Sequence, residues 1–416
     1  MKPRIFNVPQ MFEAFHNPNY RFLWPSNFLS YASRWTQVTI LGWLILERTG
    51  SPFLVALVAF FAWSPMLFLG LVGGYLADSV NRQKVLLFSQ SVTLISTLLM
   101  TALLLTDLLE IWHSYLIITV NGSVLALEVP SRRSLIHTFL GNHGVANGVA
   151  LDFVALSASR MLGPILAGLL TQFWGFVGGY LLVVIFHFVC ICLLLNLKIH
   201  FTLQPSKIGS TIFGDLLHGI RYVKNHHVLI GVVAISLTMH LLLYPYVSMV
   251  PVIAGDLLNI GPGFKLGMLQ SAAGIGALTG AIVLASIGNI NFYGRIFMFG
   301  AMLTMFSLLL FSFSTWYEMS FAVLIFLGVG TAVFGTMQAT LIMILSSEDV
   351  RGKVIGVITL IIGIGPFGTL SVGAVADIID ASFALGFNAI LGIGLLIFIV
   401  SRNTNLFNPI TSNSAK

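Results

Sequence analysis

Long apolar stretches, separated by short polar connections, follow one another along the chain from residue 22 to residue 401. A helix needs roughly 20 apolar residues to cross about 30 Å of hydrocarbon, and each stretch is long enough. The pattern predicts an all-α integral membrane protein with twelve transmembrane helices. The expected spans are 22–47, 52–77, 84–106, 112–138, 145–172, 175–197, 228–255, 264–288, 294–313, 317–345, 353–378 and 381–401.

The longest polar interruption divides these spans into two sets of six. Equal halves are typical of transporters built from structural repeats, with the substrate site between them. Within the interruption, residues 212–223 carry apolar side chains at helical spacing, which predicts a short helix on the membrane surface. We expect an amino-terminal six-helix bundle over 1–197, a cytoplasmic linker over 198–227, and a carboxy-terminal bundle with a short tail over 228–416.

Composition excludes a water-soluble fold, since apolar residues make up 57% of the chain, charged residues 8%, and the mean hydropathy is +0.96. Sixteen of the 20 Lys and Arg residues fall in every second connection, and only Arg48 and Lys265 fall in the others. Lys and Arg are retained in the cytoplasm, so we expect both termini there and the protein in the cell (inner) membrane. The net charge of +6 follows from this placement and predicts no nucleic-acid partner.

No motif for catalysis or metal binding accompanies the spans. The sequence has no HExxH, GxSxG or Walker pattern and no Cys/His set at metal-ligand spacing. Its two cysteines, Cys190 and Cys192, lie one residue apart in an apolar span, where neither a disulfide nor a metal site is expected. We therefore expect no enzyme, no cofactor and no metal. The expected partners are a small-molecule substrate, protons and membrane lipids, for a protein that is a monomer.

Three sequence strings connect the spans to a known family. NPNYRFLW precedes the first span, GGYLADSVNRQKVLL follows the second, and SASRMLGPILAGLL lies in the fifth. Through them, nearly the whole chain resembles the major facilitator superfamily, and within it the bacterial exporter group that includes the enterobactin exporter and related drug and lysophospholipid transporters. The resemblance implies two six-helix bundles that open alternately to the two sides of the membrane.

The resemblance also implies roles for the residues at matching positions. An acid at a helix end, beside a turn and two cations, can hold a cytoplasmic gate through charge pairs. A proline bends its helix and can favour one access state. The gate motif corresponds to Gly74, Asp78, Arg82 and Lys84. The kink motif corresponds to Gly163, Pro164 and Gly168, with Gly365 and Pro366 in the eleventh span.

The chain departs from the family pattern in three places. Asn81 stands where the gate motif usually has glycine, and because Asn tolerates left-handed geometry we expect the turn to persist. The corresponding loop of the second half keeps Arg295 but has no acid. In the fourth span, Ile118 occupies the position at which many proton-coupled exporters carry an arginine.

Ionisable side chains at membrane depth are costly and usually mark a substrate or proton path. Glu128 lies about 16 Å from the cytoplasmic end of the fourth span, and Asp152 and Arg160 lie about 12 Å apart along the fifth. The alternative is that both acids pair permanently with Arg132, Arg133 or backbone donors near the cytoplasmic surface. The candidates for proton coupling are Glu128, Asp152, Arg160 and His240.

Candidates for the substrate cavity lie in the first, fourth and seventh spans. Arg34, midway along the first span, is a candidate partner for an anionic substrate group or for Glu128. His240 and its neighbouring tyrosines are expected to line the second half of the cavity, unless the histidine only bonds one helix to another. The one acid of the first span, Glu47, lies near its outer end, which favours anionic or zwitterionic substrates over cationic drugs. The cavity candidates are Arg34, Trp35, Gln37, Asn121, Tyr244 and Tyr246.

The sequence thus predicts a secondary active transporter, a proton-coupled exporter of small amphipathic molecules such as siderophores, drug-like compounds or other anionic and zwitterionic metabolites. The alternatives are a lysophospholipid flippase, a proton-independent facilitator and, less favoured, a substrate sensor without transport.

Overall fold

The structure is a computed structural model that describes residues 12–198, 212–287 and 292–408; within these ranges it leaves the side chains of residues 71–79, 142–143, 212–213, 215 and 348–349 undescribed. The helices are η1 (Glu13–His16), α2 (Pro18–Thr49), α3 (Pro52–Ser79), α4 (Arg82–Leu105), α5 (Ile111–Leu195), α6 (Ile212–Lys224), α7 (His227–Thr238), η2 (Met239–Leu243), α8 (Tyr246–Asp256), α9 (Phe264–Ser286), α10 (Tyr293–Ser312), α11 (Tyr317–Leu345), α12 (Glu348–Ile378), α13 (Ala381–Arg402) and η3 (Thr404–Phe407).

Twelve membrane-spanning segments can be traced through the described residues, as the apolar pattern predicts. α5 contains three of them, divided at Gly141 and Gly175, whose φ angles of 61° and 64° suit glycine. α7, η2 and α8 together form one further segment. Nine described stretches are long and apolar enough to cross a membrane, and one of these, 144–195, holds two segments. The two remaining segments, α2 and the first segment of α5 (111–141), are not among the nine; α2 carries a row of polar side chains that face the protein interior.

Local side chains explain where the first helices begin and end. Asn17 caps α2 by accepting hydrogen bonds from the N–H groups of Asn19 (2.9 Å) and Tyr20 (3.3 Å). The prediction of left-handed backbone geometry at Asn81 is wrong, because the φ and ψ angles of this residue are −59° and 112°. Its side chain instead caps α4, where it accepts from the N–H of Gln83 at 3.0 Å. Asparagine is therefore suited to this turn as a helix cap.

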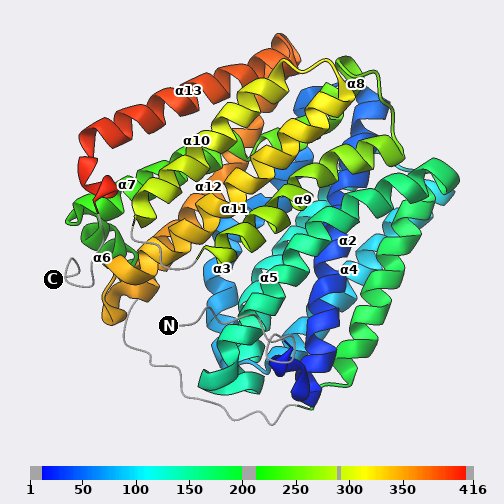
Figure 1. Ribbon diagram of the computed structural model, residues 1–416. Helices are drawn as coiled ribbons and strands as arrows, with labels where there is room; N and C mark the ends of the chain where they lie inside the picture. The colour runs from blue at the N-terminus through cyan, green and yellow to red at the C-terminus, as the bar shows by residue number, and fades with distance from the viewer. Residues whose placement is uncertain (1–11, 199–211, 288–291, 409–416) are drawn as a thin grey trace.

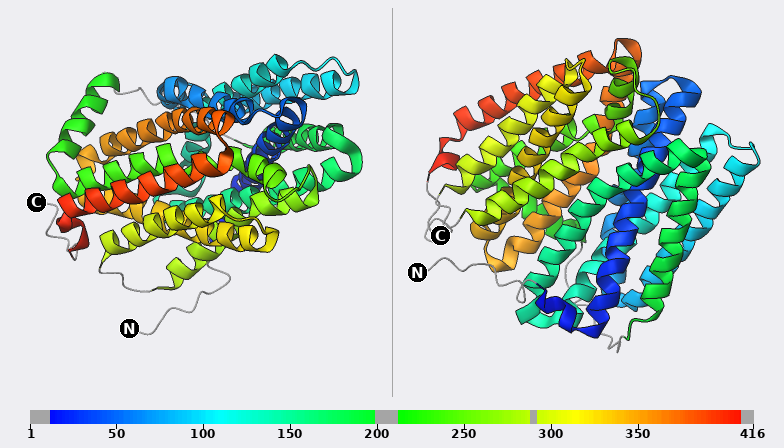
Figure 2. Two further views of the ribbon diagram at one scale, coloured as in Figure 1. Left: turned by 90° about the horizontal axis from the view of Figure 1, so that it is seen from above. Right: turned by 45° about the vertical axis from the view of Figure 1, so that its right-hand side comes forward.

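The helices form two six-helix bundles that lie side by side (Figure 1). α2 to α5 make the first bundle, and α7 to α13 make the second. The bundles contact each other mainly through α5 with α9 and α3 with α12. Seen from above, the two sets remain distinct (Figure 2). A site between the bundles is therefore lined by helices from both halves of the chain.

Glycines let α5 and α9 approach to backbone contact. A Cβ atom added to Gly168 would lie 2.5 Å from the carbonyl oxygen of Gly263, and one added to Gly267 would lie 2.4 Å from that of Pro164. Small residues at such a crossing permit close packing in lipid. This contact joins the two bundles at backbone distance.

Further contacts between the bundles lie near the same end of the helices. The Ser51 hydroxyl donates to the Asp377 carboxylate at 2.6 Å, and the N–H of Phe264 donates to Gln172 Oε1 at 3.1 Å. This end is opposite the one that carries η1, α6 and η3 (Figure 1), and we call it the outer end after the topology expected from the sequence. The bundles are thus joined at the outer end.

Candidate functional site

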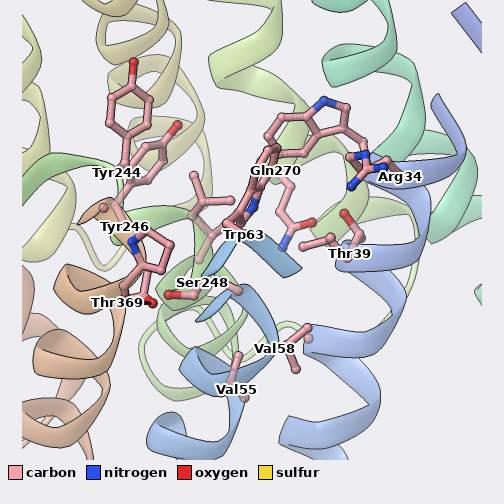
Figure 3. Close-up of a pocket in the computed structure, with 18 of the residues that line it drawn as sticks. Arg34, Thr39, Val55, Val58, Trp63, Tyr244, Tyr246, Ser248, Gln270 and Thr369 are labelled. Atoms are coloured by element: carbon pink, nitrogen blue, oxygen red, sulfur yellow. Dashed lines mark hydrogen bonds between the residues drawn. The ribbon is translucent and has the colours of Figure 1, made fainter. Parts of the chain in front are cut away.

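A cavity of about 330 Å³ lies between the two bundles. Figure 3 shows Arg34 and Trp63 of the first bundle on one side of this cavity and Tyr244 and Tyr246 of the second on the other, with Gln270 between Trp63 and Arg34. Most of the remaining lining is apolar and comes from α2, α3, α8 and α12. A largely apolar cavity with a few convergent polar groups is typical of a small-molecule site.

Two arginines supply the fixed charges of this cavity. The Arg34 guanidinium lies 5.9 Å from the ring centroid of Trp63, and that of Arg160 lies 5.4 Å from the ring centroid of Trp35. Arg160 Nη2 also donates to the Tyr246 hydroxyl at 3.1 Å. The described lining contains no Asp or Glu. Because arginine stays protonated, this lining is electrostatically suited to an anion.

A π-helical turn presents His240 to the cavity from the second bundle. Met239–Leu243 interrupts the α-helical pattern, and Pro245 precedes α8. His240 Nδ1 lies 2.8 Å from the carbonyl oxygen of Ser236, and its ring centroid is 4.8 Å from that of Tyr244. π-turns of this kind often occur at functional sites. Here the turn brings histidine and tyrosine to the same wall.

The Gly-Pro pairs position helices around the cavity. A Cβ atom on Gly163 would lie 2.7 Å from Cβ of Trp35 and 3.1 Å from the backbone oxygen of Ala32, so the glycine allows α5 to pack closely against α2. Pro164 then lines the cavity. In α12, Gly365 and Pro366 also line it, beside the π-turn.

Glu128 lies outside the described lining, in a buried ion pair within the first bundle. Its Oε1 accepts from Arg132 Nε at 2.6 Å, and Arg132 Nη2 makes a second contact. Gln90 Nε2 donates to the same oxygen at 2.7 Å and the Ser30 hydroxyl at 2.9 Å. Glu128 is 2% exposed and Arg132 1%. This pairing matches the alternative that the sequence left open for Glu128.

Asp152 also lies outside the described lining but has a different environment. Asn27 Nδ2 donates to Asp152 Oδ1 at 2.7 Å, and the Tyr31 hydroxyl donates to Oδ2 at 3.2 Å. Among the described side chains, no cation forms an ion pair with this carboxylate. Asn27 Oδ1 in turn accepts from Arg132 at 2.5 Å. One amide therefore connects Asp152 to the buried ion pair.

The remaining residues singled out from the sequence lie in several places. Gln37 and Asn121 are not in the described lining but are joined by a 3.1 Å hydrogen bond inside the first bundle. In the gate motif, Arg82 Nη1 donates to the Thr138 hydroxyl at 3.0 Å, and Lys84 is exposed. The other two gate residues, Gly74 and Asp78, belong to the range whose side chains lie outside the description.

Sequence reasoning missed a polar row on the first span. Asn27, Ser30, Tyr31 and Arg34 occupy positions i, i+3, i+4 and i+7, which lie on one helix face. That spacing in an apolar span was the available signal. The buried His187, whose Nδ1 lies 2.7 Å from Gln90 Oε1, was also missed, and only the folded structure shows its partners.

Comparison with known proteins agrees with this architecture. The family model described as transmembrane secretion effector, MFS_3, matches residues 10–412. The staphyloferrin A transporter of Staphylococcus aureus is 23% identical over 398 residues, covering 93% of this chain and 97% of the relative. The enterobactin exporter EntS of Shigella flexneri is 24% identical over 344 residues, covering 80% of each chain.

Solved structures share the fold at low identity. The peptide transporter POT in complex with sulfate has a TM-score of 0.75 and 11% identity, covering 94% of this chain and 95% of that one. A bacterial homologue of the human lysosomal transporter Spinster, in an inward-facing and unoccupied conformation, has a TM-score of 0.68 and 13% identity, covering 94% and 96%. With a family match over nearly the whole length, the chain belongs to the transmembrane secretion effectors of the major facilitator superfamily, and it is a transporter of small molecules rather than an enzyme.

Proposed function

We propose that this protein exports small amphipathic anions by alternating access. The observation that carries the proposal is the pair Arg34 and Arg160, which face a largely apolar cavity whose described lining contains no carboxylate. A guanidinium over an aromatic ring binds carboxylate or sulfonate while its neighbours bind apolar groups. The cavity thus combines both requirements of an amphipathic anion.

The relatives support a more specific substrate class. One is a staphyloferrin A transporter and another an enterobactin exporter. We extend these names to the proposal that the substrate is a siderophore-like molecule or another anionic or zwitterionic metabolite. Export is the favoured direction because the matched family is described as transmembrane secretion effectors and one relative is named an exporter. The outer end is closed by contacts such as Ser51–Asp377, and this state is open to substrate from the side of η1 and α6.

The expected topology completes the proposal. Both termini lie in the cytoplasm of a cell (inner) membrane, and the bundles 1–197 and 228–416 rock about the cavity while 198–227 tethers them. Arg82 and Asp78 would hold the opposite gate after the bundles rock. The protein acts as a monomer, surrounded by lipid.

Proton coupling is the finer part of the proposal, and the two acids are not equally suited to it. Glu128 is enclosed by four hydrogen-bonding contacts from Arg132, Gln90 and Ser30. Asp152 has only neutral donors, Asn27 and Tyr31, among its described bonding partners. A carboxylate without an ion pair takes up a proton more readily, so Asp152 is the better candidate. A proton-independent facilitator and a lysophospholipid flippase are the alternative functions.

Ligand binding to the purified protein tests the substrate class. A naphthalene disulfonate should bind in isothermal titration calorimetry, whereas the neutral disulfonamide of the same shape should bind much more weakly. A naphthylmethylammonium ion should not bind, because two guanidiniums repel it. Equal affinity for all three probes, or preference for the cation, would overturn the proposal.

A further inference from the structure

We infer that the substrate anion and a proton bind this transporter together rather than in competition, so that the membrane potential, and not proton antiport, drives net export; the inference rests on the proposed function. It concerns the driving force, which the fold alone leaves open. Each step follows from the sign of the charges around the cavity.

The first step concerns the groups that line the cavity. Arg34 and Arg160 keep their positive charges at any physiological pH, so a proton cannot displace an anion from them. His240 is the histidine in the described lining. Its protonation adds positive charge to the same wall and therefore attracts an anion. Proton uptake by the lining thus favours substrate binding.

The second step concerns Asp152. The titratable and charged groups around its carboxylate are Tyr20 and Tyr31 from α2, and Arg132 and Arg133 from α5 itself. Tyr31 donates to Asp152 and lies three residues before Arg34, on the same face of α2. An ionised Asp152 therefore places negative charge beside the face of α2 that carries Arg34.

Protonation of Asp152 removes that negative charge and lowers the repulsion of an incoming anion. By reciprocity, a bound anion makes Asp152 easier to protonate. Glu128 also acts on Arg34 from within its buried pair with Arg132, and its negative charge opposes an incoming anion in the same direction as that of Asp152. Protonation of the histidine and protonation of the carboxylate therefore both strengthen binding of the anion.

The third step is the consequence for energy coupling. Antiport requires that the proton and the substrate exclude each other from the carrier, and here they promote each other's binding. A proton that travels with the anion makes an outside-acid gradient oppose export. An anion that leaves a negatively charged interior moves with the field, and about 100 mV sustains an approximately 50-fold gradient per net charge. A dianion accompanied by one proton still carries one net negative charge outward.

The pH dependence of binding tests the sign of this linkage. Naphthalene disulfonate is a suitable probe because it stays ionised throughout the range. Its affinity for the wild-type protein should rise about fivefold or more from neutral to mildly acidic pH. Asp152→Asn should bind at neutral pH as the wild type does in acid, with a smaller pH dependence. Affinity that falls in acid would overturn the inference.

Flux in proteoliposomes tests the driving force with the wild-type protein alone. High external K⁺ with valinomycin makes the vesicle interior positive, and the external disulfonate should then accumulate towards the approximately 50-fold limit per net charge at about 100 mV. With equal K⁺ and valinomycin, which hold the potential at zero, an acidic interior should produce no accumulation. Accumulation driven by the acidic interior would establish antiport and overturn the inference.

The two experiments distinguish failure of this inference from failure of the proposed function. Folded protein that neither binds nor moves the disulfonate would refute both. Binding and flux with proton competition would refute only the inference. Protein-free vesicles and vesicles containing the Arg34→Gln variant give the background for passive leakage.

Discussion

Arginine has two different environments in the first bundle. Arg132 is 1% exposed and fully occupied by Glu128, Asn27 and Ser26. Arg34 lines the cavity, where the ring face of Trp63 is near its guanidinium. The charge of Arg132 is neutralised inside the protein, whereas the charge of Arg34 is available to a ligand. The two sites therefore predict opposite consequences of mutation.

Removing the charge of Glu128 should destabilise the protein. In Glu128→Gln, Arg132 loses its ionised partner in a dry environment, and loss of one member of a buried pair costs about 3–5 kcal/mol. The melting temperature in detergent should fall markedly. Asp152→Asn is the matched control, because Asp152 makes no ion pair among the described side chains and an amide can still accept from Tyr31, so its melting temperature should fall much less. Equal melting temperatures for the two variants would contradict the structural role of Glu128.

Removing the charge of Arg34 should weaken anion binding without unfolding the protein. A charge-assisted hydrogen bond contributes about 1.5–3 kcal/mol, so Arg34→Gln should raise the Kd for naphthalene disulfonate roughly 10- to 100-fold. Arg402→Gln, at the far end of α13, removes the same charge from the surface and should leave the Kd unchanged. If both variants bind like the wild type, Arg34 is not a ligand of the anion.

At the scale of elements, helices from the two bundles close the outer end by direct contact. α5 and α9 meet at Gly168 and Gly267, and the Asp377 carboxylate of α12 accepts from Ser51 beside the start of α3. α3 and α12 each end with Gly-x-x-Ala-Asp, at Asp78 and Asp377. A carboxylate near a helix amino terminus is favourable. These contacts must break when the outer end opens.

A larger side chain at Gly168 should shift the protein towards the outward-open state. Its Cβ would lie 2.5 Å from a carbonyl oxygen of the opposite bundle, which cannot be accommodated without separating α5 from α9. The reporter is Val58→Cys, a cysteine in the cavity, introduced in a Cys192→Ser background. An impermeant maleimide added from outside should react faster with this cysteine when Gly168→Val is also present. Gly255→Val, whose Cβ meets nothing within 4 Å, is the control and should leave the rate unchanged.

Asp377→Asn should also shift the protein towards the outward-open state, but less than Gly168→Val does. The neutral amide can still meet Ser51 but loses the charge-assisted part of the bond, worth about 1 kcal/mol near a surface. The reaction of Val58→Cys from outside should accelerate several-fold. A rate that slows would show that Asp377 favours the open outer end instead.

The sequence predicts the elements better than their partners. Apolar runs fix the spans, and the i to i+4 spacing of Glu128 and Arg132 allows their pairing to be considered in advance. The bond of Asn27 to Asp152 joins residues 125 positions apart, so only the packing of α2 on α5 brings them together. The π-turn that presents His240 likewise depends on tertiary packing, because helix propensity does not encode it.

At the scale of the whole molecule, alternating access requires the two bundles to separate at the outer end while the cavity keeps its lining. The main described contacts between the bundles are those of α5 with α9 and of α3 with α12. Of these four helices, the linker helix α6 packs only against α12. Most of the second bundle's buried core lies within that bundle, but Trp43 of α2 and Ala56 of α3 pack with it, so these two contacts must shift when the bundles rotate about the cavity.

A cross-link across the outer end should stop transport reversibly. Ser51 and Asp377 lie on opposite bundles with side chains in contact, so cysteines introduced at both positions can be joined by a short bifunctional thiol reagent that contains a disulfide. Exchange of the disulfonate should cease after cross-linking and return after reduction. Either single cysteine variant, treated alike, should retain exchange. Undiminished exchange in the cross-linked protein would exclude opening at this end.

The most direct test of anion transport by alternating access is counterflow in proteoliposomes with no potential and no pH gradient. Vesicles loaded with unlabelled naphthalene disulfonate should transiently accumulate the labelled compound from outside, and the neutral disulfonamide should not support accumulation. Substitution of Arg34 and Arg160 by glutamine should abolish the effect while the melting temperature is retained. Absence of counterflow from folded wild-type protein, or equal exchange of the neutral compound, would contradict the account.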